Sequence, residues 1–129
     1  MDRILVCVDH ADRRARFASA LEAAPDFVVV GATTADTAGV LAAAGRQPAA
    51  IVIESARPGL EGAKFVARLR AVAPSACLLA VAAAGDRPRT VLARSLAADR
   101  YVEPDTAMPD LLEALAELLS EHRAGHLAS

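Results

Sequence analysis

The chain has 129 residues, of which 54% are hydrophobic and 23% are charged. This length and balance fit one globular domain with a sizeable core and exclude a disordered chain. A net charge of −2 gives no electrostatic case for nucleic-acid binding by this domain, and no apolar run approaches the ~18 residues that a membrane span needs.

Short apolar runs alternate with segments of helical spacing along the chain. The N-terminus moves directly into the first apolar run with no signal-peptide layout, so we expect a cytoplasmic protein. The apolar runs predict strands at residues 4–8, 27–30, 50–53, 77–82 and 100–102. Helical spacing predicts helices at about 12–24, 34–44, 63–73, 88–97 and 109–122.

These five β-α units imply an α/β fold with a parallel sheet, helices on both faces and right-handed crossovers. We expect Gly31 to stop the second strand. One domain is predicted over residues 1–122. Residues 123–129 are predicted to be a frayed tail or the start of a linker.

Two carboxylates follow or end predicted strands. Asp9 comes after the first strand and Glu54 ends the third. If these strands are neighbours, the two acids share one site at the carboxyl edge of the sheet, where Mg²⁺ could bind. The alternative is that Asp9 caps a helix and Glu54 is a solvated loop acid.

Other candidate features predict ordinary structural roles. We interpret the cluster Arg13, Arg14 and Arg16 as the solvated face of a helix, with a partner-docking surface as the alternative. Cys7 and Cys77 fall in predicted buried strands. With another strand between them they would stand ~10 Å apart, too far for a disulfide.

The sequence does not favour an enzyme. No glycine-rich phosphate loop follows the first strand, which argues against nucleotide binding. The serines lack a recognisable His/Asp context, so a hydrolase triad has little support. The three histidines, His10, His122 and His126, are predicted to be surface residues.

A series of short motifs stands in a fixed order over essentially the whole chain. They are Val8-Asp9-His10, residues 24–26 with 29–31, Ile53-Glu54 followed by residues 57–62, Asp99-Arg100-Tyr101, Asp105-Thr106 and residues 111–115. This order and spacing resemble the receiver domain of two-component response regulators. The nearest resemblance is to receivers that precede a helix-turn-helix output domain. The resemblance implies the CheY-like, flavodoxin-like fold, a doubly wound five-stranded parallel sheet in the order 2-1-3-4-5.

The phosphorylation-site positions depart from the pattern of that family. Val8 replaces one acid of the acidic pair and leaves only Asp9, a weak candidate metal ligand. Glu54 replaces the phosphoacceptor aspartate, and Ala82 replaces the Thr/Ser that ends the fourth strand. The lysine after the fifth strand falls on Pro104, or on Glu103 with one deletion. Only the aromatic switch position, Tyr101, fits.

The resemblance therefore implies a degenerate receiver, a phosphorylation-independent module for signalling and protein interaction. Its pairing surface would include Leu92, Arg94, Arg100 and Tyr101. We expect a homodimer, no resident cofactor, a sensor kinase or other signalling protein as a possible partner, and DNA contact only through an output domain outside this chain.

Three alternatives stay open. Glu54 could imitate the phosphorylated state, although Ala82 has no hydroxyl to respond to it. Glu54 or Asp9 could be a weak phosphoacceptor helped by Mg²⁺. The more apolar crevice made by Val8 and Ala82 could sense a small molecule.

Overall fold

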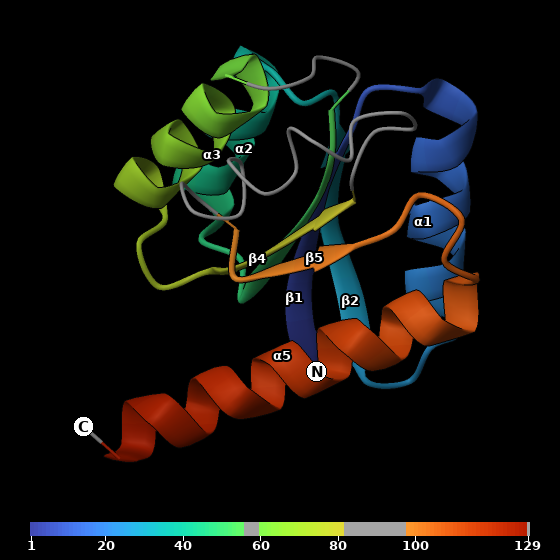
Figure 1. Cartoon of the computed structure of the whole chain (residues 1–129), viewed down its shortest axis with the longest axis vertical. Coiled ribbons are helices and arrows are strands. Elements are labelled where there is room, and N and C mark those ends of the chain that lie inside the picture. The colour runs from blue at the N-terminus through green and yellow to red at the C-terminus, as the bar shows by residue number, and fades with distance from the viewer. Residues whose placement is uncertain (56–59, 82–97, 129) are drawn as a thin grey trace.

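A parallel sheet with helices on both faces organises the chain (Figure 1). The structure, a computed structural model, describes residues 1–55, 60–81 and 98–128. The elements are β1 (Asp2–Val8), α1 (Ala11–Ala23), β2 (Phe27–Thr33), α2 (Thr37–Arg46), β3 (Ala50–Glu54), α3 (Leu60–Val72), β4 (Cys77–Val81), β5 (Arg100–Val102) and α5 (Met108–Ala128). The five strands are all parallel, in the order β2-β1-β3-β4-β5. The predicted flavodoxin-like topology is confirmed.

The sheet separates two apolar layers. One layer packs α1 and α5 against the sheet, around Phe17, Leu21 and Leu115. The other packs α2 and α3 on the opposite face, around Val40, Phe65 and Leu69. Figure 1 shows the same division, with α2 and α3 together on one side of the strands. The central strands β1, β3 and β4 are buried on both faces, which is why their sequences are continuous apolar runs.

The second strand is longer than predicted, because Gly31 does not stop it. β2 continues to Thr33, with a register shift at which Ile4 pairs with Val29 and Leu5 with Gly31. A Cβ at position 31 would lie 3.0 Å from the Leu5 side chain. Glycine serves here for close packing against β1 rather than for a turn.

Two helix ends also differ from the prediction. α2 runs to Arg46 and ends on Gln47, which has a φ of 45° and donates side-chain hydrogen bonds to carbonyls of both α2 and α3. The last helix continues to Ala128 instead of ending at His122, so most of the predicted tail is helical. The predicted helix at 88–97 lies outside the described residues.

Both cysteines are free and buried, as predicted. Cys7 belongs to the layer of α2 and α3, and Cys77 to the layer of α1 and α5. β3 lies between their strands, so each thiol is a small packing group on its own face of the sheet.

Candidate functional site

The candidate site lies at the carboxyl edge of the two central strands. Val8 pairs with Glu54 in the parallel register of β1 and β3. The backbone N–H of Asp9 donates to the Glu54 carbonyl at 3.0 Å. The predicted adjacency of the strand ends that carry the two acids is therefore confirmed.

Glu54 is a buried carboxylate rather than a solvated loop acid. It is the last residue of β3 and is only 8% exposed. Both of its oxygens accept hydrogen bonds from Arg13: Nε donates to Oε1 at 2.5 Å, and Nη2 donates to Oε2 at 2.7 Å. This is the parallel two-bond geometry in which a guanidinium binds a carboxylate most strongly.

Arg13 reaches this carboxylate from the first turns of α1. The guanidinium carbon also lies 5.3 Å from the centre of the Phe17 ring, one helical turn further on, in a cation–π contact. Its hydrogen bonding to Glu54 raises the pKa of Arg13, against the opposing effect of burial. The side chain therefore stays fully charged wherever the protein is folded.

Asp9 points its carboxylate into a different set of bonds. Oδ1 accepts from the backbone N–H of Ala35 at 2.8 Å, which ties the end of β1 to the segment between β2 and α2. The N-cap of α1 is His10, with no side-chain cap hydrogen bond. The alternative that Asp9 is the N-cap of this helix is wrong, because His10 holds that position.

The interpretation of the basic cluster on α1 as a solvated face is wrong for two of its three arginines. Only Arg16 is exposed; Arg13 and Arg14 are half-buried. Arg14 donates to the carbonyl of Val8 at 2.8 Å and to that of Asp9 at 3.4 Å. Two consecutive arginines thus fasten the start of α1 to the ends of β3 and β1.

A signal for these contacts exists in the sequence. Arginine in the first turn of a helix is disfavoured by the helix dipole, which places partial positive charge there. Arg13 and Arg14 stand at the third and fourth positions of α1, and Asp12 is the acid of that turn. Such a placement predicts that the arginines have acceptors outside the helix.

The other sequence-predicted positions lie in varied surroundings. Val8 is fully buried in the α1/α5 layer. Tyr101 is half-buried on β5 beside Ala80 and packs against the α2/α3 layer. Pro104 follows β5, and the chain's one lysine, Lys64, is on α3. Ala82, Leu92 and Arg94 lie outside the described residues.

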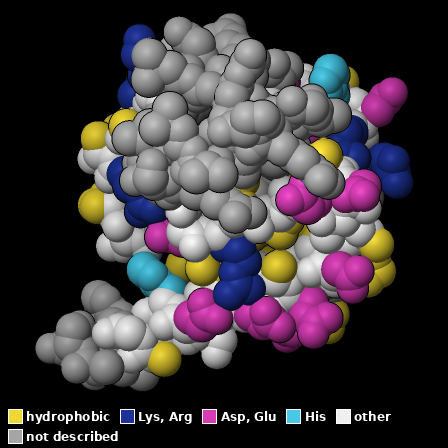
Figure 2. Space-filling model, in the orientation of Figure 1, with side chains coloured by type: hydrophobic (Ala, Val, Ile, Leu, Met, Phe, Trp, Pro, Cys, Tyr) yellow, Lys and Arg dark blue, Asp and Glu magenta, His cyan; other side chains and the backbone are white. Residues whose placement is uncertain are grey.

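Arg100, a predicted pairing residue, makes contacts within the chain. From β5 it donates to Glu117 at 3.0 Å and to Glu121 at 2.9 Å, both on α5. Figure 2 shows a row of acidic side chains along α5 with a basic side chain beside it. The carboxylates raise the pKa of Arg100 through hydrogen bonds. These pairs join β5 to α5 and are largely open to solvent.

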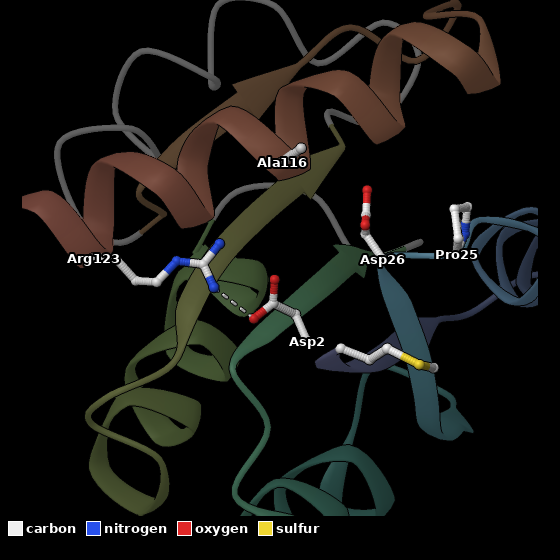
Figure 3. Close-up of a pocket in the computed structure, with 6 residues that line it drawn as sticks. Asp2, Pro25, Asp26, Ala116 and Arg123 are labelled. Carbon is white, nitrogen blue, oxygen red and sulfur yellow. Dashed lines mark hydrogen bonds and ion pairs between the residues drawn. The ribbon is translucent and has the colours of Figure 1, made fainter.

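Two of the surface hollows lined by described residues lie away from this edge. One, of about 310 Å³, lies between α1 and the start of α5 and is lined by Ala15, Arg16, Ser19 and Met108. The other, of about 270 Å³, lies at the opposite edge of the sheet, where Arg123 of α5 bonds Asp2 at 2.9 Å (Figure 3). Neither includes Asp9 or Glu54.

Comparisons with known proteins give a consistent picture of the fold. No protein-family model matches the sequence, and no curated protein matches it. Solved structures do match. A CheY-like receiver domain protein from Methanospirillum hungatei JF-1 superposes with a TM-score of 0.80 at 23% identity, over 97% of this chain and 98% of that chain. The chain has the fold of a response regulator receiver domain.

Two further structures agree. The receiver domain of the putative response regulator NarL from Mycobacterium tuberculosis gives a TM-score of 0.81 at 20% identity, over 92% of this chain and 96% of that one. A DNA-binding response regulator of the LuxR family from Staphylococcus aureus gives a TM-score of 0.75 at 16% identity. The match covers 92% of this chain and 99% of that chain. No helix among the described residues is long and apolar enough to cross a membrane.

Proposed function

We propose that this chain is an atypical receiver domain, a signalling and protein-interaction module whose state is not set by phosphorylation. The observation that carries the proposal is the two-bond pairing of Arg13 with Glu54. Phosphoryl transfer to a carboxylate needs a free oxygen nucleophile and cations that neutralise the phosphoryl oxygens. Here both oxygens at the acceptor position are already bound to a guanidinium.

The neighbouring positions support the same proposal. Val8 contributes a buried methyl surface where the receiver pattern has an acid. Pro104 and Glu103 supply no cation at the end of β5. A phosphoryl group at Glu54 would therefore meet one guanidinium already committed to the carboxylate, without the usual lysine or second metal-binding acid.

The pairing also weighs against the idea that Glu54 imitates a phosphorylated residue. Imitation requires a negative charge that other groups can sense. The charge of Glu54 is balanced by Arg13 at 2.5–2.7 Å, and the acid is nearly excluded from solvent. Loss of the switch is the better supported of the two alternatives.

The proposed role is regulation through partners. The S. aureus structure that shares the fold is described as a DNA-binding response regulator. By analogy we propose that this domain acts through homodimerisation, with a helix-turn-helix output domain or a partner protein making any contact with DNA, and signals without catalysing a reaction. Sedimentation at several concentrations tests the homodimer, and a concentration-independent monomer contradicts that part.

Exposure to acetyl phosphate with millimolar Mg²⁺, followed by amide NMR, tests phosphorylation independence. We expect no shifts centred on Glu54, Asp9 or Tyr101, while a conventional receiver under the same conditions shows them. Shifts clustered at these residues would establish the weak-phosphoacceptor alternative. A rise in melting temperature with a small metabolite would instead favour the sensor alternative.

A further inference from the structure

The receiver fold implies a divalent cation at this edge of the sheet, but the residues present do not fit one. Mg²⁺ takes oxygen ligands and is held in proteins by one or two carboxylates. Glu54 gives both oxygens to Arg13, and Asp9 gives Oδ1 to the N–H of Ala35. Among the described residues no group of three or more His, Cys, Asp or Glu side chains could hold a metal.

We infer that Arg13 is the resident cation of the site and that its guanidinium closes the site to divalent metal ions. The inference concerns the same site as the proposed function and deepens it. On this account the site is occupied by a side chain of the chain itself rather than merely eroded by substitutions.

The geometry favours displacement of a metal by this side chain. A guanidinium presents its donors in a fixed planar arrangement that matches a carboxylate. The Arg13 bonds use Nε and Nη2 together, so neither oxygen of Glu54 is left with its full capacity for a metal. A second positive charge within a few ångströms of the guanidinium would also be repelled.

Arg13 is held in place from two sides. Phe17 supports the guanidinium from within α1, at 5.3 Å. Arg14, the next residue, anchors the same helical turn to the Val8 carbonyl. A guanidinium that its helix already positions loses less conformational entropy on pairing than a mobile side chain does. It therefore competes well with ions from solution for the Glu54 carboxylate.

The position of this arginine is itself informative. It stands in the N-terminal turn of α1, where the helix dipole disfavours a cation. That helix has no side-chain N-cap hydrogen bond. The favourable interaction with Glu54 offsets that local cost. A neutral residue would suit an isolated helix better, so the tertiary contact accounts for arginine at this position.

The test is Mn²⁺ titration of the whole chain, read as site-specific broadening of amide NMR signals. Three proteins are compared: wild type, Arg13→Gln and Arg16→Gln. Arg16 lies on the same helix and is exposed, so its variant has the same change in charge without opening the site. Exposed acids on α5, such as Glu113, provide an internal reference for weak surface binding.

We expect Arg13→Gln to bind Mn²⁺ near Glu54 and Asp9 on the order of tenfold more tightly than wild type, from removal of one nearby positive charge. Arg16→Gln should match wild type, and Arg13→Gln with Glu54→Gln should lose the gain. If Arg13→Gln fails to fold, Arg13→Lys serves, since it keeps a charge but cannot make the two parallel bonds; an intermediate gain is expected.

Equal Mn²⁺ affinity in wild type and the Arg13 variants, or an equal gain in Arg16→Gln, would overturn the inference. Failure here is distinguishable from failure of the proposed function. The proposed function fails if wild type responds to acetyl phosphate, whereas this inference fails if removal of Arg13 opens no metal site.

Discussion

At the residue scale, the two partners of the Arg13–Glu54 pair differ in their exposure to solvent. The Glu54 side chain is 10% exposed and the Arg13 side chain is 35% exposed. Loss of the arginine leaves a buried carboxylate without a partner, which costs more than loss of the acid, because water reaches the guanidinium. The asymmetry leads to a directional prediction.

Arg13→Gln should lower the free energy of unfolding more than Glu54→Gln. In a double-mutant cycle the coupling should be about 1–2 kcal/mol, toward the lower end for charge-assisted bonds because solvent screens the exposed partner. Urea denaturation measures all four proteins. A coupling near zero would contradict a net stabilising interaction between Arg13 and Glu54.

The two acids of the site could be predicted from sequence, but their bonds could not. Parallel strands end at one edge of a sheet, which predicts that Asp9 and Glu54 lie close together if their strands are neighbours. The partner of Glu54 depends on how α1 lies across β3, a tertiary fact that spacing along the chain does not contain. Arg13 is 41 residues away in sequence. Only the unfavourable position of an arginine in a first helical turn hinted at it.

At the scale of elements, α2 offers a matched pair of glycines. A Cβ at Gly39 would lie 3.0 Å from Cys7 Sγ and 3.0 Å from the Thr34 carbonyl oxygen. A Cβ at Gly45 would meet nothing within 4 Å. Gly39 is therefore required by packing against β1, whereas Gly45 is not.

Gly39→Ala should destabilise the protein by about 1–3 kcal/mol, because the backbone carbonyl cannot move aside and overpacking outweighs helix propensity. Gly45→Ala should stabilise it by about 0.5 kcal/mol through propensity alone. Thermal unfolding of the two variants tests whether their changes in stability have opposite signs. Destabilisation by both would mean that α2 ends earlier than Arg46.

Element ends were the least predictable feature, and each error has a physical reason. Gly31 signalled a strand end, but the glycine is needed for contact with Leu5 inside β2. The end of α2 was placed too early because Gln47, rather than glycine, adopts the left-handed cap and satisfies the last carbonyls with its amide. Residues 123–125 of α5, just past the predicted end, are exposed, so no apolar stripe marks the continuation of the helix there.

At the scale of the whole molecule, the pattern of the sequence predicted an α/β fold with a parallel sheet, whereas the strand order was implied by the resemblance to receiver domains. Continuous apolar runs separated by helical segments indicate parallel strands buried on both faces and joined by right-handed crossovers. The fold therefore depends on many residues at once. A local property such as a buried ion pair changes it little.

The two thiols report on both layers of the core. Burial raises the pKa of Cys7 and of Cys77 from 9.0 to about 11. In the unfolded chain these thiols ionise near pH 9, whereas in the folded protein they stay neutral. Their contribution to stability is thus fully present below pH 9 and is lost as the pH rises toward 11.

We expect both thiols to resist labelling in the native protein at pH 8, at rates set by global unfolding. The free energy of unfolding should fall between pH 9 and 11. In a Cys7→Ala, Cys77→Ala double variant, the free energy of unfolding should fall less steeply over the same range. Labelling kinetics with and without denaturant provide the measurement. Rapid labelling of one thiol alone would show that its layer opens independently.

The measurement that tests the central claim most directly is a titration of the wild-type chain with beryllofluoride and millimolar Mg²⁺, observed by amide NMR. The pairing of Arg13 with Glu54 predicts no saturable shifts at Glu54, Asp9 or Tyr101. Saturable shifts spreading from Glu54 to Tyr101 would show that the acid accepts a phosphoryl-like group and would contradict the account.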